Sequence, residues 1–134
     1  MLIILRYHSH SREQIGDGLW GGLVIHKPAE IQNEQPYYGY DEEILLLIGD
    51  WFHHPAEELM TKYLHWSSAG AEPVPDSMLA NGVGSFNCSM LIRTSTRECT
   101  EAVRPHLRAE KGKKYRFRVV NVGYVHFPEF EKML

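Results

Sequence analysis

The chain has 134 residues, with 14 basic and 17 acidic side chains that give a net charge of −3, and 43% of its residues are hydrophobic. This composition is ordinary for a globular protein, so the length supports a hydrophobic core and excludes a disordered chain. The one basic run, at 111–118, is too narrow for a nucleic-acid interface, and no apolar stretch reaches the roughly 20 residues of a membrane helix.

The first part of the chain predicts two short strands. Residues 1–10 are an apolar run that ends in polar histidines, and turn signals follow at Asp17-Gly18 and Gly21-Gly22 before the apolar run LVIH. From 27 to 40 the hydrophobic pattern disappears and two prolines occur, which marks a linker. The opening MLIIL is too short for a signal peptide.

The second part predicts a core strand, a helix and further strands. Residues 42–52 form a continuous apolar run, typical of a strand that is buried on both faces. HHPAEELMTKYLHW predicts a short helix with Pro55 at its first position, and Asn81-Gly82 predicts a hairpin turn. Two more strands are expected at SMLIRTS (89–95) and KYRFRVVNVG (114–123), the second with its basic residues on a solvent-facing side. The expected fold is mostly β.

His8 and His10 are the candidate metal ligands. Side chains two residues apart in a strand project from one face, so two imidazoles would lie on the same side, ~6 to 7 Å apart at the backbone. Imidazole nitrogen suits copper, zinc, iron and nickel, so the spacing names no single metal, and two hydrogen-bonded or solvent-facing histidines would have the same spacing. His53 and His54 are adjacent and would face opposite ways, which favours helix capping or surface exposure.

A cupin-type metal barrel is one alternative, because it also uses H-x-H followed by a glutamate. Only two residues separate Glu13 from His10, one fewer than in that pattern, and no later P-x-G-x-x-H supplies a third histidine. A non-catalytic β-domain that acts as a metal-binding or interaction module is the other alternative. The cupin interpretation predicts a third ligand beside the two histidines, with Glu13 as its candidate.

Four ordered blocks carry a more specific resemblance. YHSHSREQIGDGLWGGLVIHKP, DEEILLLIGDWFHH, PDSMLANGVGSFNCS and KKYRFRVVNVG resemble, in order, segments of the multicopper oxidase family in its laccase-like and ascorbate-oxidase-like branches. The resemblance implies an all-β chain, a partial cupredoxin-like (plastocyanin-like) β-sandwich with one short helix. Residues 1–30 would end a first cupredoxin-like domain, 31–40 would be a linker, and 41–134 would begin a second domain. The chain would therefore be an internal fragment.

The resemblance also implies copper. In that family the H-S-H histidines are ligands of the paired coppers in a trinuclear cluster, and they correspond to His8 and His10. The family further uses H-W-H-G, H-x-x-H-x-H-G and H-C-H segments, and none of them occurs in this sequence. Cys88 and Cys99 have no adjacent histidine, so a mononuclear copper site is expected to be absent and the chain is expected to be inactive alone.

Three further residues gain a role from the resemblance. Asp76 resembles an acidic position that lines the reducing-substrate pocket, although a turn-forming Asp after Pro75 would look the same. Cys88 and Cys99 correspond to a disulfide of ascorbate-oxidase-like members, whereas two free thiols would be expected in a cytosolic protein. The implied reaction oxidises a phenol, ascorbate or similar small molecule while dioxygen is reduced to water, in a secreted protein with neither nucleic acid nor membrane as partner.

Overall fold

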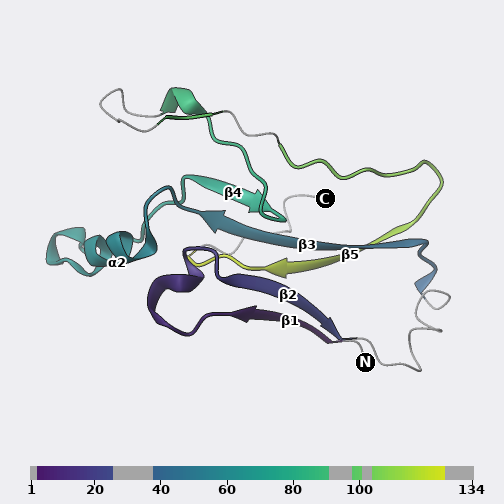
Figure 1. Ribbon diagram of the computed structural model, residues 1–134, viewed down its shortest axis with the longest axis horizontal. Helices are drawn as coiled ribbons and strands as arrows, with labels where there is room; N and C mark the ends of the chain where they lie inside the picture. Colours follow the sequence, from purple (N-terminus) through teal and green to yellow (C-terminus); the bar gives the residue numbers. More distant parts are fainter. Residues whose placement is uncertain (1–2, 26–37, 91–97, 101–103, 126–134) are drawn as a thin grey trace.

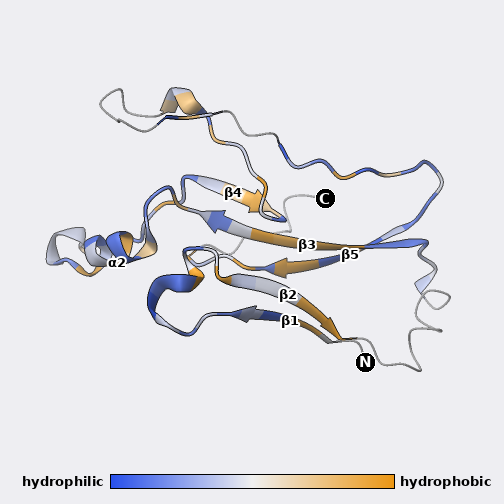
Figure 2. Ribbon diagram, viewed as in Figure 1, coloured by the Kyte–Doolittle hydropathy of each residue, from blue (hydrophilic) through white to orange (hydrophobic). Residues whose placement is uncertain are grey.

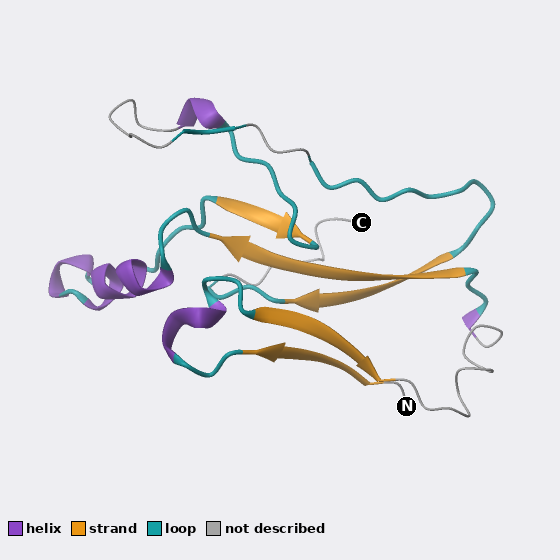
Figure 3. Ribbon diagram, viewed as in Figure 1, coloured by secondary structure: helices purple, strands orange, loops and turns teal. Residues whose placement is uncertain are grey.

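The computed structural model describes residues 3–25, 38–90, 98–100 and 104–125, and these ranges are mostly β-structure with a short helix (Figures 1 and 3). The strands are β1 (Ile3–His8), β2 (Trp20–Ile25), β3 (Glu42–Trp51), β4 (Ser77–Ala80) and β5 (Tyr115–Asn121). The helical elements are α2 (Ala56–Leu64) and the short 3-10 turns η1 (Arg12–Ile15), η2 (Trp66–Ser68) and η3 (Cys88–Met90). The predicted fold class, β with one short helix, is confirmed.

The strands form two sheets. β1 and β2 pair as an antiparallel hairpin in which His8 lies opposite Trp20, and η1 lies in the loop that joins them. In the second sheet β3 is central, antiparallel to β4 and parallel to β5. Figure 1 shows the hairpin lying along β5 and β3, with α2 beyond the end of β3.

The inner face of the hairpin packs on the second sheet. A Cβ at Gly22 would lie 2.8 Å from a methyl of Leu47 and 3.2 Å from one of Leu45, so a side chain at this position would have to displace the ends of these leucines. On the same face Arg6 Nη1 donates to the carbonyl oxygens of Asn121 (3.5 Å), the last residue of β5, and of Gly123 (3.4 Å), just beyond it. His8 follows Arg6 by two residues and therefore projects from this inner face.

The outer faces of both sheets remain apolar and exposed. On the hairpin Leu5 and Leu23 are each 45% exposed, and on β5 Phe117 and Val119 are 49% and 41% exposed. Figure 2 shows orange, hydrophobic stretches along β3, β5 and the end of β2. The prediction that 42–52 is buried on both faces is wrong, because the described residues place no second sheet against the outer side of β3. In the described residues the two sheets therefore do not close into a complete β-sandwich.

Local expectations differ from the structure in three places. Pro55 lies just before α2 rather than within it. The Asn81-Gly82 turn is present, but beyond it Val83 makes only an isolated bridge to Ala80, and β4 pairs with β3. SMLIRTS is not a strand where it is described, since Ser89 and Met90 belong to η3. Residues 91–97 lie outside the described ranges, as do 26–37, which hold most of the expected linker.

Arg118 contradicts the prediction that the basic residues of its strand share a solvent-facing side. Its side chain is only 2% exposed, and its guanidinium is ion-paired with Glu43, which is 24% exposed. The hydrogen bond from Arg118 is the main reason why the pKa of Glu43 is lowered, and it outweighs burial, which raises this pKa. A buried cation is tolerated only when it is paired, so tertiary pairing overrides the alternation of the sequence.

None of the described helices is both long enough and apolar enough to cross a bilayer.

Candidate metal centre

His8 and His10 lie at the end of β1 and present their rings to the same side. The two imidazoles stack with their centroids 4.7 Å apart and an interplanar angle of 22°. His8 is the last residue of the strand, so the alternation that aims its ring inward extends through Ser9 to His10. The two imidazoles therefore lie next to each other on one side of the chain.

Ser9, between the two histidines, fixes the backbone at the end of β1. Its backbone N–H donates to the carbonyl of Leu19 at 3.0 Å, which extends the β1–β2 pairing by one bond. Its hydroxyl donates to Gln14 Oε1 at 2.6 Å and accepts from the backbone N–H of Ser11 at 3.1 Å. These bonds tie the tripeptide to the loop that contains η1.

The environment of His8 favours a neutral imidazole. Its Nδ1 is buried and has no hydrogen-bond partner among the described residues. Desolvation lowers the pKa of His8, and the positive charges of Arg6 and of a protonated His10 lower it further. Because a metal binds the neutral form of imidazole, this ring is in its ligating form at neutral pH.

The residues present fit copper in type but not in number. Imidazole is a ligand that copper accepts. Nδ1 of His8 has no hydrogen-bond partner among the described residues, so this atom is available to bind a metal. Within the described ranges, no three His, Cys, Asp or Glu side chains are grouped so that they could hold a metal ion. Glu13 is described and does not complete such a group with His8 and His10, so it is not the third ligand that the cupin alternative expects.

Asp76 is held at the junction of β3 and β4. Its Oδ2 accepts a hydrogen bond from the backbone N–H of His53 at 2.7 Å, and its own N–H donates to the carbonyl of Trp51 at 3.0 Å. Both bonds join Asp76 to residues at the end of β3 and are not the local bonds of a turn-forming aspartate, whose side chain accepts from its own backbone two residues on. Its Oδ1 lies 4.0 Å from Nδ1 of His53, and its side chain is 35% exposed.

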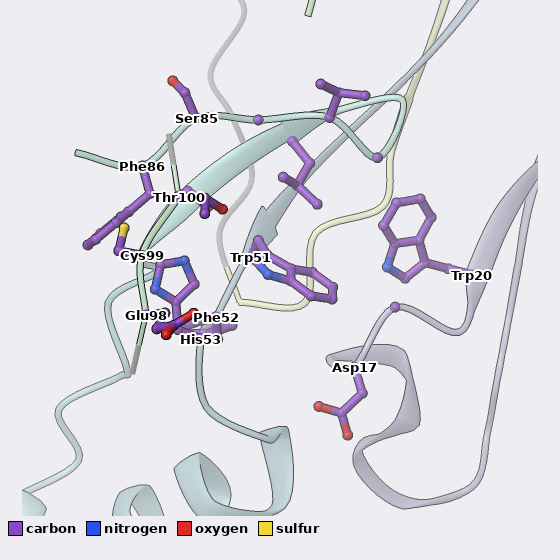
Figure 4. Close-up of a pocket in the computed structure, with 16 residues that line it drawn as sticks. Asp17, Trp20, Trp51, Phe52, His53, Ser85, Phe86, Glu98, Cys99 and Thr100 are labelled. Carbon is purple, nitrogen blue, oxygen red and sulfur yellow. The ribbon is translucent and has the colours of Figure 1, made fainter. Parts of the chain in front are cut away.

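A pocket of about 920 Å³ opens beside this junction (Figure 4). Figure 4 shows Asp17 and Trp20 at one end of it and His53, Phe86 and Cys99 at the other. The ring of His53 meets Phe86 edge-on, with centroids 4.5 Å apart. Asp76 itself does not line the pocket, whereas the adjacent Ser77 does.

The sequence predicts helix capping or surface exposure for His53 and His54. His54 is exposed, and its Nδ1 lies 3.3 Å from Glu58 Oε2, one helical turn along. His53 instead bonds Asp76 and lines the pocket. No local signal marks this role, because 23 residues separate the two and the antiparallel pairing of β3 with β4 brings them together.

Cys88 and Cys99 are joined by a disulfide, with their Cα atoms 5.8 Å apart. The bridge connects η3 to the described segment 98–100, and Cys99 also lines the pocket. A disulfide of this kind persists in oxidising compartments rather than in the cytosol.

Comparison with known proteins agrees with these observations. The model of the multicopper oxidase family matches residues 42–130. The chain is 38% identical over 119 residues to the iron transport multicopper oxidase fetC of Epichloe festucae, covering 87% of this chain and 15% of that protein. It is 34% identical over 128 residues to laccase-2 of Botryotinia fuckeliana, covering 92% of this chain and 19% of the laccase.

Solved structures give the same result. The crystal structure of the laccase from Botrytis aclada superposes with a TM-score of 0.68 at 31% identity, over 90% of this chain and 20% of the laccase. Fet3p, a multicopper oxidase that functions in iron import, superposes with a TM-score of 0.64 at 26% identity, over 90% of this chain and 18% of that one. The chain thus spans no more than a fifth of these relatives. Because the family model covers more than half of its residues, the chain belongs to the multicopper oxidase family.

Proposed function

We propose that this chain is part of a copper-dependent oxidase that takes electrons from a reducing substrate while dioxygen is reduced to water. The observation that carries the proposal is the stacked pair of His8 and His10 on the inner side of the hairpin. The reducing substrate would be a phenol, ascorbate or a similar donor, and two of the relatives described above, an iron transport multicopper oxidase and one that functions in iron import, add iron as a candidate.

In this proposal His8 and His10 hold copper through neutral imidazoles. When bound, copper supplies the electron transfer to dioxygen, which no amino-acid side chain here performs. Ser9 ties the segment that carries the two ligands to the loop after it, and Arg6 docks the strand against the end of β5. The disulfide between Cys88 and Cys99 supports an extracellular or secreted location.

The remaining copper ligands are proposed to lie in polypeptide outside these 134 residues. The chain spans between 15% and 20% of the length of the relatives named above, and both sheets leave an apolar outer face exposed. Exposed apolar faces of this kind are normally covered in a folded protein. Turnover is therefore expected from the complete oxidase and not from this chain alone.

The first test is the reading frame on either side of the coding sequence. H-W-H-G upstream and H-C-H downstream are expected, and finding neither would remove the catalytic proposal.

The complete product is then purified, loaded with copper and assayed for oxygen consumption with a phenol and with ferrous iron. His8→Ala/His10→Ala should abolish consumption, and His54→Ala/His65→Ala, which changes two exposed histidines, should not. Full consumption by the first variant would refute the proposed role of the pair.

Asp76 is proposed to face the reducing substrate as a proton acceptor. Asp76→Asn retains an oxygen for the N–H of His53 but removes the base, so the fold should persist. The expected result is a loss of about 10²-fold in phenol oxidation by the complete oxidase, with oxidation of a substrate that releases no proton unchanged. If Asp76→Asn oxidises both substrates at the wild-type rate, Asp76 has a structural role alone.

A further inference from the structure

We propose that Asp17 is a positioning residue for the His8–His10 pair, which it orients by fastening the loop after the histidines to the first residue of α2. The inference rests on the proposed function in one respect, namely that the two imidazoles are copper ligands. The contact itself joins residues 39 positions apart and does not involve the histidines directly.

The start of α2 needs an acceptor that its own sequence does not supply. The residue at the N-cap is Pro55, whose side chain cannot accept a hydrogen bond. The backbone N–H of Ala56, a residue that is only 1% exposed, donates instead to Asp17 Oδ1 at 2.8 Å. The carboxylate therefore satisfies a buried donor and also places negative charge at the positive end of the helix.

The loop approaches the helix closely enough to make this bond specific. A Cβ on Gly16 would lie 2.8 Å from Cβ of Ala56 and 3.0 Å from a ring carbon of Tyr124. Gly18, on the other side of Asp17, has a φ of +94°, which side-chain-bearing residues rarely adopt. Two glycines thus let the backbone seat Asp17 directly over the helix start.

From Asp17 a short series of hydrogen bonds leads to the histidines. Two residues on, the N–H of Leu19 donates to the carbonyl of Gln14 at 3.0 Å, and the carbonyl of Leu19 accepts from the N–H of Ser9 at 3.0 Å. The side chain of Gln14 accepts from the hydroxyl of Ser9 at 2.6 Å. Ser9 lies between His8 and His10, so a shift of the loop on α2 is transmitted to the tripeptide.

This arrangement matters because ligand geometry depends on the groups that hold the ligands. His10 lies outside β1, so the strand ladder alone does not fix its ring against that of His8. Groups that orient metal ligands without touching the metal are worth large factors in affinity. Asp17 ties this loop to α2 through a bond from a buried backbone N–H, and an exposed ion pair between Arg12 and Glu57, with N···O 3.9 Å, is a second link between the loop and the helix.

The test separates positioning from simple stabilisation of α2. Asp17→Ala/Pro55→Ser removes the link but gives the helix its own N-cap, since serine at position 55 can accept from the backbone N–H of Glu57 or Glu58. Asp17→Asn keeps the oxygen that accepts from Ala56. Asn81→Ala is the matched control, because it removes two side-chain bonds to the backbone of β3, neither of which involves the loop or the strand that holds the histidines.

Nuclear Overhauser contacts between the ring protons of His8 and His10 are measured in the chain without metal, together with thermal melting. The proposal predicts these contacts in the wild type, in Asp17→Asn and in Asn81→Ala. It predicts their loss in Asp17→Ala/Pro55→Ser, although the chain with the recapped helix still melts cooperatively. Unchanged contacts in the recapped variant would overturn the proposal. Failure of the copper role would show separately, as copper binding that is insensitive to His8→Ala/His10→Ala.

Discussion

Replacing Glu43 with leucine is expected to destabilise the chain by about 3 kcal/mol, or on the order of 10 °C in melting temperature. Arg118 lies between the second sheet and the hairpin with 2% of its side chain exposed, and its charge cannot move into water when the carboxylate is lost. Breaking one side of a buried ion pair is costly for this reason, whereas exposed pairs contribute little.

Two companion variants check the cause of this loss. Glu43→Leu/Arg118→Met removes both charges and should recover most of the stability, because an apolar pair of similar volume replaces the ion pair. Glu42→Leu removes the neighbouring carboxylate that is paired with Lys113, where both side chains are more than a third exposed, and should change stability by less than about 1 kcal/mol. Equal effects of Glu43→Leu and Glu42→Leu, measured by urea unfolding, would contradict the assignment.

The same pair predicts a pH dependence. The hydrogen bond from Arg118 lowers the pKa of Glu43 below its ordinary value of 4.5, so the folded state holds this proton less tightly than the unfolded state. The contribution of Glu43 is therefore complete above the unfolded pKa and is lost as the pH falls through the lower folded pKa. The stability gap between wild type and Glu43→Leu should be constant above pH 4.5 and shrink below it.

Strong local patterns predicted the elements well. The apolar runs gave β1, β3 and β5, and the turn residues and acidic first turn gave α2, because each depends on neighbours in the sequence. The two-residue spacing of His8 and His10 likewise predicted one shared side for their rings. The resemblance to multicopper oxidases, carried by four ordered blocks, is confirmed by the family match.

Contacts between distant segments were not predictable in the same way. β3 pairs with β5 across 73 positions, from Glu42 to Tyr115, and this register moves Arg118 from an expected solvent-facing side to a buried one. The bond from Ala56 to Asp17 has the same character, as nothing near Pro55 indicates a cap from another segment. The faces of β3 are only half-buried, because the burial of a strand depends on what packs against it and not on its own apolar sequence.

Removing both imidazoles is expected to have the largest effect on metal binding. Even groups that only orient a ligand are worth about 10- to 100-fold in affinity, so His8→Ala/His10→Ala should weaken copper binding to this chain by at least about tenfold. His54→Ala/His65→Ala removes two exposed imidazoles and serves as the control for incidental binding at the surface.

The most direct measurement is the electron paramagnetic resonance spectrum of this chain with one equivalent of Cu²⁺. The account predicts hyperfine coupling to two imidazole nitrogens in the wild type and in His54→Ala/His65→Ala, and its loss in His8→Ala/His10→Ala. A spectrum with the same two-nitrogen coupling after both His8 and His10 are removed would contradict the account.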